Sequence, residues 1–357
     1  VNGDLSVTAT TGGISDSGTT LVAGNAVFTT QQIGRSIFLD LLGVNGTIAL
    51  QTAVEGDATV VNKTSIDFAS STVGGNLSAT ATTGGIADNG TITVGGNADF
   101  TSLQSDADVL LDQLSVSGTI SVSTVGTSGD VTLVNATAID LAASSVNGDL
   151  SVTATTGGIS DSGTTLVAGN AVFTTQQNGQ SIFLDLFGVN GTIALQTAVN
   201  GDATIVNKTS IDFAASTVGG NLSATATTGG ITESGAVMVA KTARFETREA
   251  NETILLDKLA IDGSIALFTQ GGGGNAVIVN TTQVDLAASD IGGDLNVTAT
   301  SGGMTDSGTV TVGGNADFTS LQSGADIVVN QLAVSGSISM STVGASGNAT
   351  LVNATAI

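Results

Sequence analysis

A block of 72 or 73 residues recurs along this 357-residue chain. Its opening phrase, VNGDLSVTATTGGISDSGT from Val1, returns in closely similar form at Val73, Val146, Val218 and Ile291. Sequence that recurs at a fixed period predicts structural units that stack on one another. We therefore expect one continuous domain, 1–357, built from copies at 1–72, 73–145, 146–217, 218–290 and an incomplete 291–357.

Each copy contains a finer rhythm of a glycine, alternating apolar and small polar residues, and a threonine. In the first copy such segments begin at Gly3, Gly24 and Gly46, and the next one, at Gly75, follows only after 29 residues. Alternation with a period of two is typical of strands, and the Gly, Ser, Asn and Asp residues between the segments are typical of turns.

Further short apolar runs follow each start, as in AVFTT, SIFLD and LLGV. Three strands per turn and about three turns per copy, about fifteen turns in all, describe an all-β fold, a right-handed parallel β-helix (β-solenoid) of roughly triangular section. A sandwich of antiparallel hairpins also uses short strands and turns. The β-solenoid is favoured because stacked copies explain why the same side chain recurs at the same place.

Equivalent apolar residues are expected to stack in columns. One inward-facing aromatic column is expected at Phe28, Phe100, Phe173, Phe245 and Phe318. A second apolar column is expected at Phe38, Leu110, Phe183, Leu255 and Val328. Within LSVTA, the two-residue alternation points Leu5, Val7 and Ala9 inward and leaves Ser6 and Thr8 in solvent.

Composition agrees with stacked strands and restricts the partners. Apolar residues make up 41% of the chain, and it has no Pro, which would interrupt a strand ladder. It also has no Cys, which excludes a disulfide scaffold. The net charge of −23 argues against nucleic acid as a partner, and no apolar stretch is long enough for membrane insertion.

Two sets of acidic residues recur at turns and raise the question of Ca²⁺. They are Asp16, Asp88, Asp161, Glu233 and Asp306, and Asp67, Asp140, Asp212 and Asp285. Calcium requires several converging oxygen ligands. Equivalent acids three turns apart would be separated by about 14 Å, which is too far to share an ion. We interpret them as solvated turn acids and predict no metal site and no cofactor, with Ca²⁺ as the open alternative.

Asparagine ends a strand once per copy, at Asn62, Asn135, Asn207, Asn280 and Asn353. A corner Asn forms hydrogen bonds to its neighbours, so these residues predict a ladder that caps the turns in register. They also read Asn-x-Thr, as do Asn45, Asn190, Asn251 and Asn348, which leaves glycosylation as the alternative.

Two further patterns have a functional and a plain structural interpretation. Abundant Thr could form an ice-binding array, but SVTAT, VFTTQ and ALQTA do not keep one Thr pattern from turn to turn. The fourth copy interleaves Lys241, Arg244, Arg248 and Lys258 with Glu246, Glu249, Glu252 and Asp257. This segment is either a lateral docking patch or drift in one copy, since surface ion pairs add little stability.

Catalysis is not expected. The chain has no His and no Cys, so the usual general bases, nucleophiles and soft-metal ligands are absent. Glycosidases generally need aromatic platforms, and Trp and Tyr are also absent. We predict that the protein is not an enzyme and has no catalytic, cofactor-binding or metal-binding residues.

The phrases GNLSATATTGGI, GTITVGGNADFTS and GDLSVTATTGGI resemble the repeats of filamentous haemagglutinin-like bacterial exoproteins and related autotransporter-type surface proteins. The resemblance implies a right-handed β-helical shaft, displayed extracellularly at the bacterial cell surface, that serves adhesion or the building of a biofilm matrix. The copies here are longer and more regular than the usual coil of that family, and its secretion domain is absent from this stretch.

These observations together predict a structural and adhesive extracellular rod or fibre. Neither end of the sequence reads as a cap, so we expect either an excerpt of a much longer protein or one subunit of an end-to-end fibre. The expected partners are other copies of the chain, bound end to end or laterally, and host or matrix glycans. The alternative is a binding module that uses the repetitive solenoid face for polysaccharide or ice.

Overall fold

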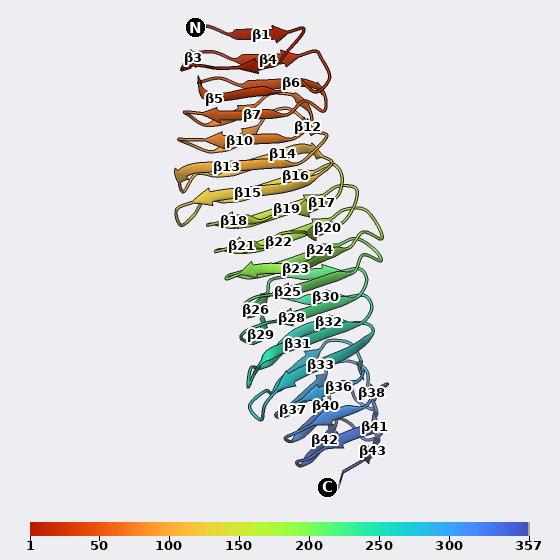
Figure 1. The fold of residues 1–357 in the computed structure, drawn as a ribbon. Coiled ribbons are helices and arrows are strands. Elements are labelled where there is room, and N and C mark those ends of the chain that lie inside the picture. Colours follow the sequence, from red (N-terminus) through yellow and green to blue (C-terminus); the bar gives the residue numbers. More distant parts are fainter. Residues whose placement is uncertain (356–357) are drawn as a thin grey trace. The chain divides into compact units, whose positions relative to one another are not determined.

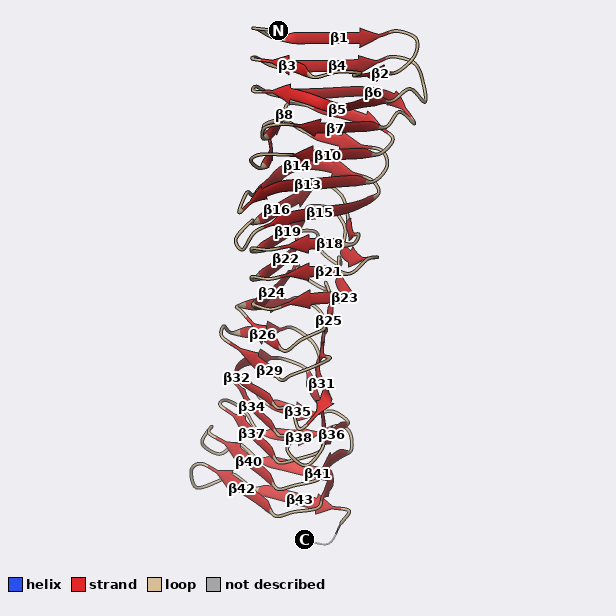
Figure 2. Cartoon of the chain, turned by 60° about the vertical axis from the view of Figure 1, so that its left-hand side comes forward, coloured by secondary structure: helices blue, strands red, loops and turns tan. Residues whose placement is uncertain are grey.

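A computed structural model describes residues 1–355 of the chain as strands and connecting turns, with no helix among them. The last two residues of the incomplete fifth copy lie outside the described part. The chain divides into two compact units, unit 1 (Val1–Gln177) and unit 2 (Asn178–Ile357). Figures 1 and 2 show the strands of each unit running side by side, turn after turn.

Unit 1 has two parallel sheets, called 1A and 1B. Sheet 1A contains β1 (Leu5–Ala9), β4 (Ala26–Thr30), β6 (Ile48–Val54), β8 (Ile66–Phe68), β9 (Ser71–Gly74), β11 (Ile86–Asp88), β12 (Ile92–Val94), β14 (Val109–Val116), β16 (Val131–Asn135), β19 (Leu150–Ala154) and β22 (Ala171–Thr175). Sheet 1B contains β2 (Ile14–Ser15), β3 (Thr20–Val22), β5 (Ile37–Val44), β7 (Ala58–Asn62), β10 (Leu77–Ala81), β13 (Ala98–Ser105), β15 (Thr119–Val125), β17 (Ile139–Leu141), β18 (Ser144–Val146), β20 (Ile159–Asp161) and β21 (Thr165–Val167).

Unit 2 is built in the same way from sheets 2A and 2B. Sheet 2A contains β24 (Thr192–Thr197), β26 (Ile211–Phe213), β27 (Ser216–Val218), β29 (Ile231–Glu233), β30 (Val237–Val239), β32 (Ile254–Ile261), β34 (Ala276–Asn280), β37 (Leu295–Ala299), β40 (Ala316–Ser320) and β42 (Ile338–Thr342). Sheet 2B contains β23 (Ile182–Val189), β25 (Ala203–Asn207), β28 (Leu222–Ala226), β31 (Ala243–Ala250), β33 (Ser264–Gln270), β35 (Val284–Leu286), β36 (Ser289–Ile291), β38 (Met304–Asp306), β39 (Val310–Val312), β41 (Ile327–Val334) and β43 (Ala349–Asn353).

Neighbouring strands belong to successive turns and pair in parallel. β1, for example, pairs with β4 so that Leu5 lies opposite Ala26 and Val7 opposite Phe28. Parallel pairing excludes a sandwich of hairpins and confirms the predicted β-solenoid. The two units together contain about 17 turns of about 21 residues each.

Each turn has one straight strand on one sheet and a bent pair of short strands on the other. In one turn β4 is the straight strand. β5 forms both short segments, because it bends between Leu39 and Leu42, where its pairing with β7 shifts register. The predicted runs AVFTT, SIFLD and LLGV correspond to these three segments. The expectation of three strands per turn is therefore met for this turn.

The number of turns per copy is three and a half rather than three. Leu5, Leu77 and Leu150 open successive copies, yet they lie in β1 of sheet 1A, β10 of sheet 1B and β19 of sheet 1A. Seven turns separate β1 from β19, so one copy advances by an odd number of half-turns. The extra half-turn lies in the 29-residue interval before Gly75, which contains β6, β7, β8 and β9. Equivalent residues of neighbouring copies therefore lie on opposite sheets and do not stack directly.

The inward-facing aromatic set is confirmed as core. Phe28, Phe100, Phe173, Phe245 and Phe318 are at most 2% exposed. In unit 2 the rings of Phe213 and Phe245 meet edge to face, with centroids 6.3 Å apart, and join sheet 2A to sheet 2B. In β1 the inward positions are less exposed than Ser6 and Thr8, as the alternation predicts.

The second apolar column does not belong to the core. Phe38, Leu110, Phe183 and Leu255 are 49%, 49%, 50% and 47% exposed, and Val328 is partly exposed. Each follows a buried residue in the first leg of a bent strand, so the alternation points it outward. Apolar character alone does not reveal this, because inward and outward positions of this leg both carry apolar residues.

The corner asparagines are internal clamps. Asn62, Asn135, Asn207 and Asn280 are 0% exposed. The Asn135 amide nitrogen donates to the carbonyl oxygens of Val116 (3.1 Å) and Ala138 (2.8 Å), and its oxygen accepts from the Val116 N–H (2.8 Å). The Thr137 hydroxyl, which completes the Asn-x-Thr motif, donates to the same Val116 carbonyl. A capping role is therefore confirmed, but each Asn binds the backbone bend of the preceding turn and not another Asn.

Asn135→Ala should lower the free energy of unfolding by about 3 kcal/mol, because it leaves buried Val116 groups without partners. Asn45→Ala is the matched control: it also removes an Asn-x-Thr asparagine, but from an exposed position, and should change stability by less than about 0.5 kcal/mol. Urea unfolding followed by circular dichroism measures both values. Equal effects of the two substitutions would contradict the clamp.

Candidate functional site

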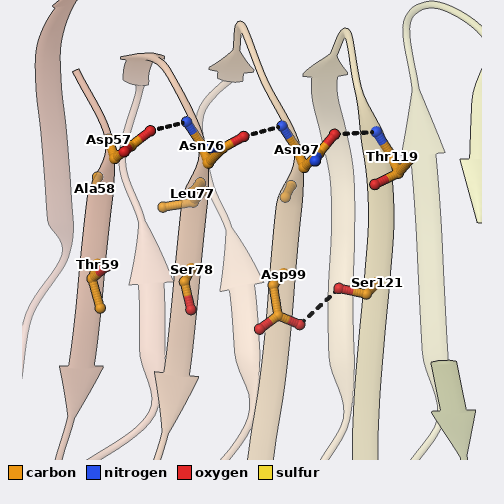
Figure 3. Close-up of a pocket in the computed structure, with 11 residues that line it drawn as sticks. Asp57, Ala58, Thr59, Asn76, Leu77, Ser78, Asn97, Asp99, Thr119 and Ser121 are labelled. Carbon is orange, nitrogen blue, oxygen red and sulfur yellow. Dashed lines mark hydrogen bonds between the residues drawn. The ribbon is translucent and has the colours of Figure 1, made fainter. Parts of the chain in front are cut away.

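Asn and Asp side chains form a hydrogen-bonded ladder on the outer surface, at the start of the straight strands. In sheet 1B the Asn76 N–H donates to the Asp57 carboxylate (2.7 Å), the Asn97 N–H to the Asn76 side-chain oxygen (2.8 Å), and the Thr119 N–H to that of Asn97 (2.9 Å). Figure 3 shows these bonds running across β7, β10, β13 and β15. Each side chain thus binds the backbone of the next turn.

The residue before each rung is usually a glycine, and the ladder requires it. A Cβ atom on Gly96 would lie 2.4 Å from the Asn76 side-chain oxygen, closer than atoms can approach. The same donor-to-acceptor contact recurs elsewhere: Asn25 to Asp4, Thr47 to Asn25, Asp149 to Asp130, Asn170 to Asp149, Asn221 to Asp202, Thr242 to Asn221, Asp294 to Asn275, Asn315 to Asp294 and Ser337 to Asn315. The sequence predicts turns at these glycines but not the ladder, although recurring Gly-Asn and Gly-Asp pairs are its visible signal.

Below this ladder in unit 1, outward side chains form a shallow groove of about 340 Å³. One row across it consists of Thr59, Ser78, Asp99 and Ser121, which are paired residues of four successive turns. The Ser121 hydroxyl donates to the Asp99 carboxylate (2.8 Å), as Figure 3 shows. The groove therefore combines a carboxylate with small hydroxyl-bearing side chains.

The first acidic set supports the bends of the long strands. Asp16 accepts the N–H groups of Asp40 (3.2 Å) and Leu41 (3.0 Å), at the bend of β5 in the next turn. Asp88 and Asp306 make the same pair of bonds to Asp112 and Gln113, and to Asn330 and Gln331. Asp161 ends β20 at the equivalent position. These side chains are therefore caps of backbone N–H groups rather than merely solvated acids.

Glu233 occupies this position in the fourth copy, and its longer side chain fits less well. One of its oxygens accepts both the Asp257 and the Lys258 N–H groups, while Oε2 is buried without a partner among residues 1–355. Burial raises the pKa of Glu233 to about 7, against the opposing effect of these hydrogen bonds. Burial also raises the pKa of Asp88.

The side chains of the second acidic set do not converge to form a metal site. Asp67 accepts from the Asn89 amide (3.2 Å), and Asp285 accepts from the Thr305 hydroxyl (3.3 Å). Asp140 and Asp212 each keep one buried oxygen without a partner in the described part of the chain. Residues 1–355 contain no group of three or more His, Cys, Asp or Glu side chains placed to hold a metal ion. The absence of cofactors stays a prediction.

Part of the charged segment of the fourth copy forms a cluster on sheet 2B. Lys258 and Asp257 lie in β32 of sheet 2A, 3.8 Å from each other, and Glu249 accepts the Gly229 N–H (2.8 Å). Arg244 pairs with Glu246 at 2.7 Å, and its guanidinium lies 4.3 Å from the centroid of the Phe268 ring. Arg248 approaches the other Glu246 oxygen at 3.6 Å. Burial raises the pKa of Glu246, but the hydrogen bond from Arg244 and the charges of Arg244 and Arg248 outweigh it and hold the pKa below its ordinary value.

Outward threonines do not form unbroken rows on the straight strands of the first copy. Thr8 lies beside Thr29, but the next turn places Gln51 beside Thr29. In the adjacent outward row, Ser6 is followed by Val27 and Ala49. The mixed rows agree with the interpretation of these threonines as ordinary strand-surface residues.

Gly96→Ala should lower the free energy of unfolding by about 1–3 kcal/mol, because the new methyl group must displace the Asn76 rung. Gly18→Ala, where a Cβ atom meets nothing within 4 Å, is the control and should cause no loss. Urea midpoints of the two variants test the ladder, and a Gly96→Ala protein as stable as wild type would refute the close approach.

Raising the pH from 5 to 8 should destabilise the protein through Glu233. Its folded pKa of about 7 lies above the ordinary value of 4.5, so between these values the folded state binds more protons than the unfolded state. The stabilisation is present below pH 4.5 and is lost as pH rises through 7, by on the order of 1 kcal/mol after allowing for solvent screening. Melting temperatures of wild type and Glu233→Gln should differ in pH slope, and identical slopes would contradict the assignment.

Comparison with known proteins identifies the family of the chain. No curated protein and no solved structure matches the chain. No helix in the described part is long and apolar enough to cross a membrane. One family model, described as repeats of unknown function (DUF5649), matches residues 55–123, 128–199, 200–265 and 273–333, and so reproduces the 72- or 73-residue period. Because these matches cover most of its length, the chain belongs to this family of repeats of unknown function.

Proposed function

We propose that this chain is a non-catalytic structural segment, displayed outside a bacterial cell, whose repeated outer faces serve adhesion or matrix building. One observation carries the proposal: within each unit the polar side chains bind the backbone of the adjacent turn, turn after turn, instead of converging on one pocket. Hydrogen bonds of this kind hold successive turns together and stiffen a solenoid. A repeat fold of this kind grows by adding copies without new chemistry.

Buried polar corners support the same role. The Thr52 hydroxyl donates to the Gly56 carbonyl (2.6 Å) and accepts from the Gly74 N–H (2.9 Å), and the Ser71 hydroxyl accepts from the Leu50 N–H (3.1 Å). These bonds connect strands to the turns beside them in the buried interior. Satisfied buried polar networks make a structure rigid and unique.

The adhesive part of the proposal rests on repetition of exposed apolar groups. Phe38, Leu110 and Leu255 each leave nearly half of their surface in solvent and occupy equivalent places in different copies. A single such contact is weak, but several on one chain act together through their high effective concentration. A bacterial surface or matrix presents many copies of the same target and therefore favours such an arrangement.

The extracellular location is supported by the likeness of GNLSATATTGGI and related phrases to the repeats of filamentous haemagglutinin-like exoproteins. The net charge of −23 is compatible with a long exposed protein, because like charges keep such chains apart in solution. Binding of polysaccharide by the same faces is the second candidate. The groove that contains Asp99, Ser78 and Ser121 favours it, because carboxylates and hydroxyls form hydrogen bonds to sugars.

The location is tested on the producing bacterium with an antibody raised against the chain. We expect label on intact cells or in the surrounding matrix, and loss of that label after protease treatment of whole cells, while an antibody against a cytoplasmic protein labels only permeabilised cells. Label that appears only after permeabilisation would refute the surface role. A glycan array probed with the purified chain separates the second candidate, since a specific saturable hit favours binding over a purely structural role.

A further inference from the structure

Two outer faces of the chain carry opposite charges at the same repeat position. In the second copy the strand β13 begins with ADFTS and presents Asp99, and in the fourth copy β31 begins with ARFET and presents Arg244. Phe100 and Phe245 face the core at equivalent places, so the outward neighbours sit on the same kind of backbone. The equivalent outward positions therefore carry a carboxylate in one copy and a guanidinium in the other.

The face in unit 1 is hollow and acidic. This acidic groove, of about 340 Å³, is lined by Asp57, Asp99 and small polar residues of β10 and β15, among others. The Asp99 carboxylate accepts one hydrogen bond, from Ser121 on one oxygen, and no other bond to it is present among residues 1–355. Its second oxygen is thus available to a donor from outside.

The face in unit 2 carries a basic ridge, defined as Arg244, Arg248, Glu246 and Phe268. Arg244 is held from two sides, by Glu246 at 2.7 Å and by the Phe268 ring at 4.3 Å, and its side chain is still 39% exposed. A guanidinium has five N–H donors, so this arrangement leaves donors directed to solvent. Because the side chain is already ordered, less conformational freedom is lost when it binds.

We propose that the basic ridge of one molecule docks into the acidic groove of a second copy of this chain, with Arg244 paired to Asp99. Charge complementarity selects this partner. The chain has seven basic residues against thirty acidic ones, and four of the seven lie between Lys241 and Lys258. The partly exposed Arg244 guanidinium on one strand face complements the Asp99 carboxylate on the other, and packed sheets lie about 10 Å apart.

The contact joins two different surfaces, so it is heterologous. Each molecule carries both the basic ridge and the acidic groove defined above, and such contacts build open chains unless the geometry closes a ring. Docking of this kind would give the structural segment a defined partner, a second copy of itself, and a defined pair of residues. It does not depend on where the protein is located.

Charge reversal and mixing test the contact. At about 150 mM NaCl, where repulsion beyond about 8 Å is screened, wild type should grow in mass with concentration in sedimentation velocity. Arg244→Asp and Asp99→Arg should each weaken self-association at least about tenfold, because each variant presents two faces of the same sign. An equimolar mixture of the two variants should associate again. In the mixture the unchanged ridge of one variant meets the unchanged groove of the other, and the two reversed faces are also opposite in charge.

Asp317→Arg is the matched control, because Asp317 occupies the equivalent position in the fifth copy and carries the same charge change. It should associate like wild type. Unchanged circular dichroism spectra and melting temperatures exclude misfolding as the cause of any loss. A wild type that stays monomeric, a mixture that fails to associate, or an Asp317→Arg protein as impaired as Asp99→Arg would each overturn the proposal.

Discussion

The close approach of successive turns at the start of each straight strand is the constraint on which the other features depend. At this point a side-chain oxygen of one turn accepts the backbone N–H of the next, as in the bond from Asn97 to Asn76. There is no room for a Cβ atom on the glycine that precedes the donor. This close approach fixes the register of the parallel strands, and with it the buried corners and the outward faces. A slip by one residue would turn every side chain to the other face.

The half-integral number of turns per copy determines how the surface repeats. Because one copy advances three and a half turns in unit 1, Leu5 and Leu77 begin equivalent strands on opposite sheets. An outward residue such as Phe38 therefore reappears as Leu110 on the other side of the solenoid. Two sides of unit 1 thus carry an exposed apolar residue at the equivalent place of the repeat.

The polar side chains divide into those that hold the fold and those that remain available. Asp16, Asp88 and Asn135 use their hydrogen-bonding capacity on backbone groups of neighbouring turns, so their recurrence reflects architecture. Asp99 and Arg244 instead point outward with bonding capacity left over. A repeated acid or asparagine in such a fold is thus a sign of structure unless its geometry leaves it free.

The sequence alone determined the repeat period, the parallel β-solenoid, the inward Phe28 set and the corner role of Asn135, because each depends on local alternation or on turn chemistry repeated many times. It could not place Phe38, since an apolar residue in a bent leg is inward or outward according to a register set by the neighbouring turns. The sequence also predicted three turns per copy instead of three and a half. The extra half-turn, within the interval before Gly75, becomes visible only when the strands are assigned to sheets. The ladder contacts, the bend-capping role of Asp16 and the Arg244–Phe268 cluster were decided by the tertiary structure, for one physical reason: each joins residues about 20 or more positions apart that only the coiling of the chain brings within bonding distance.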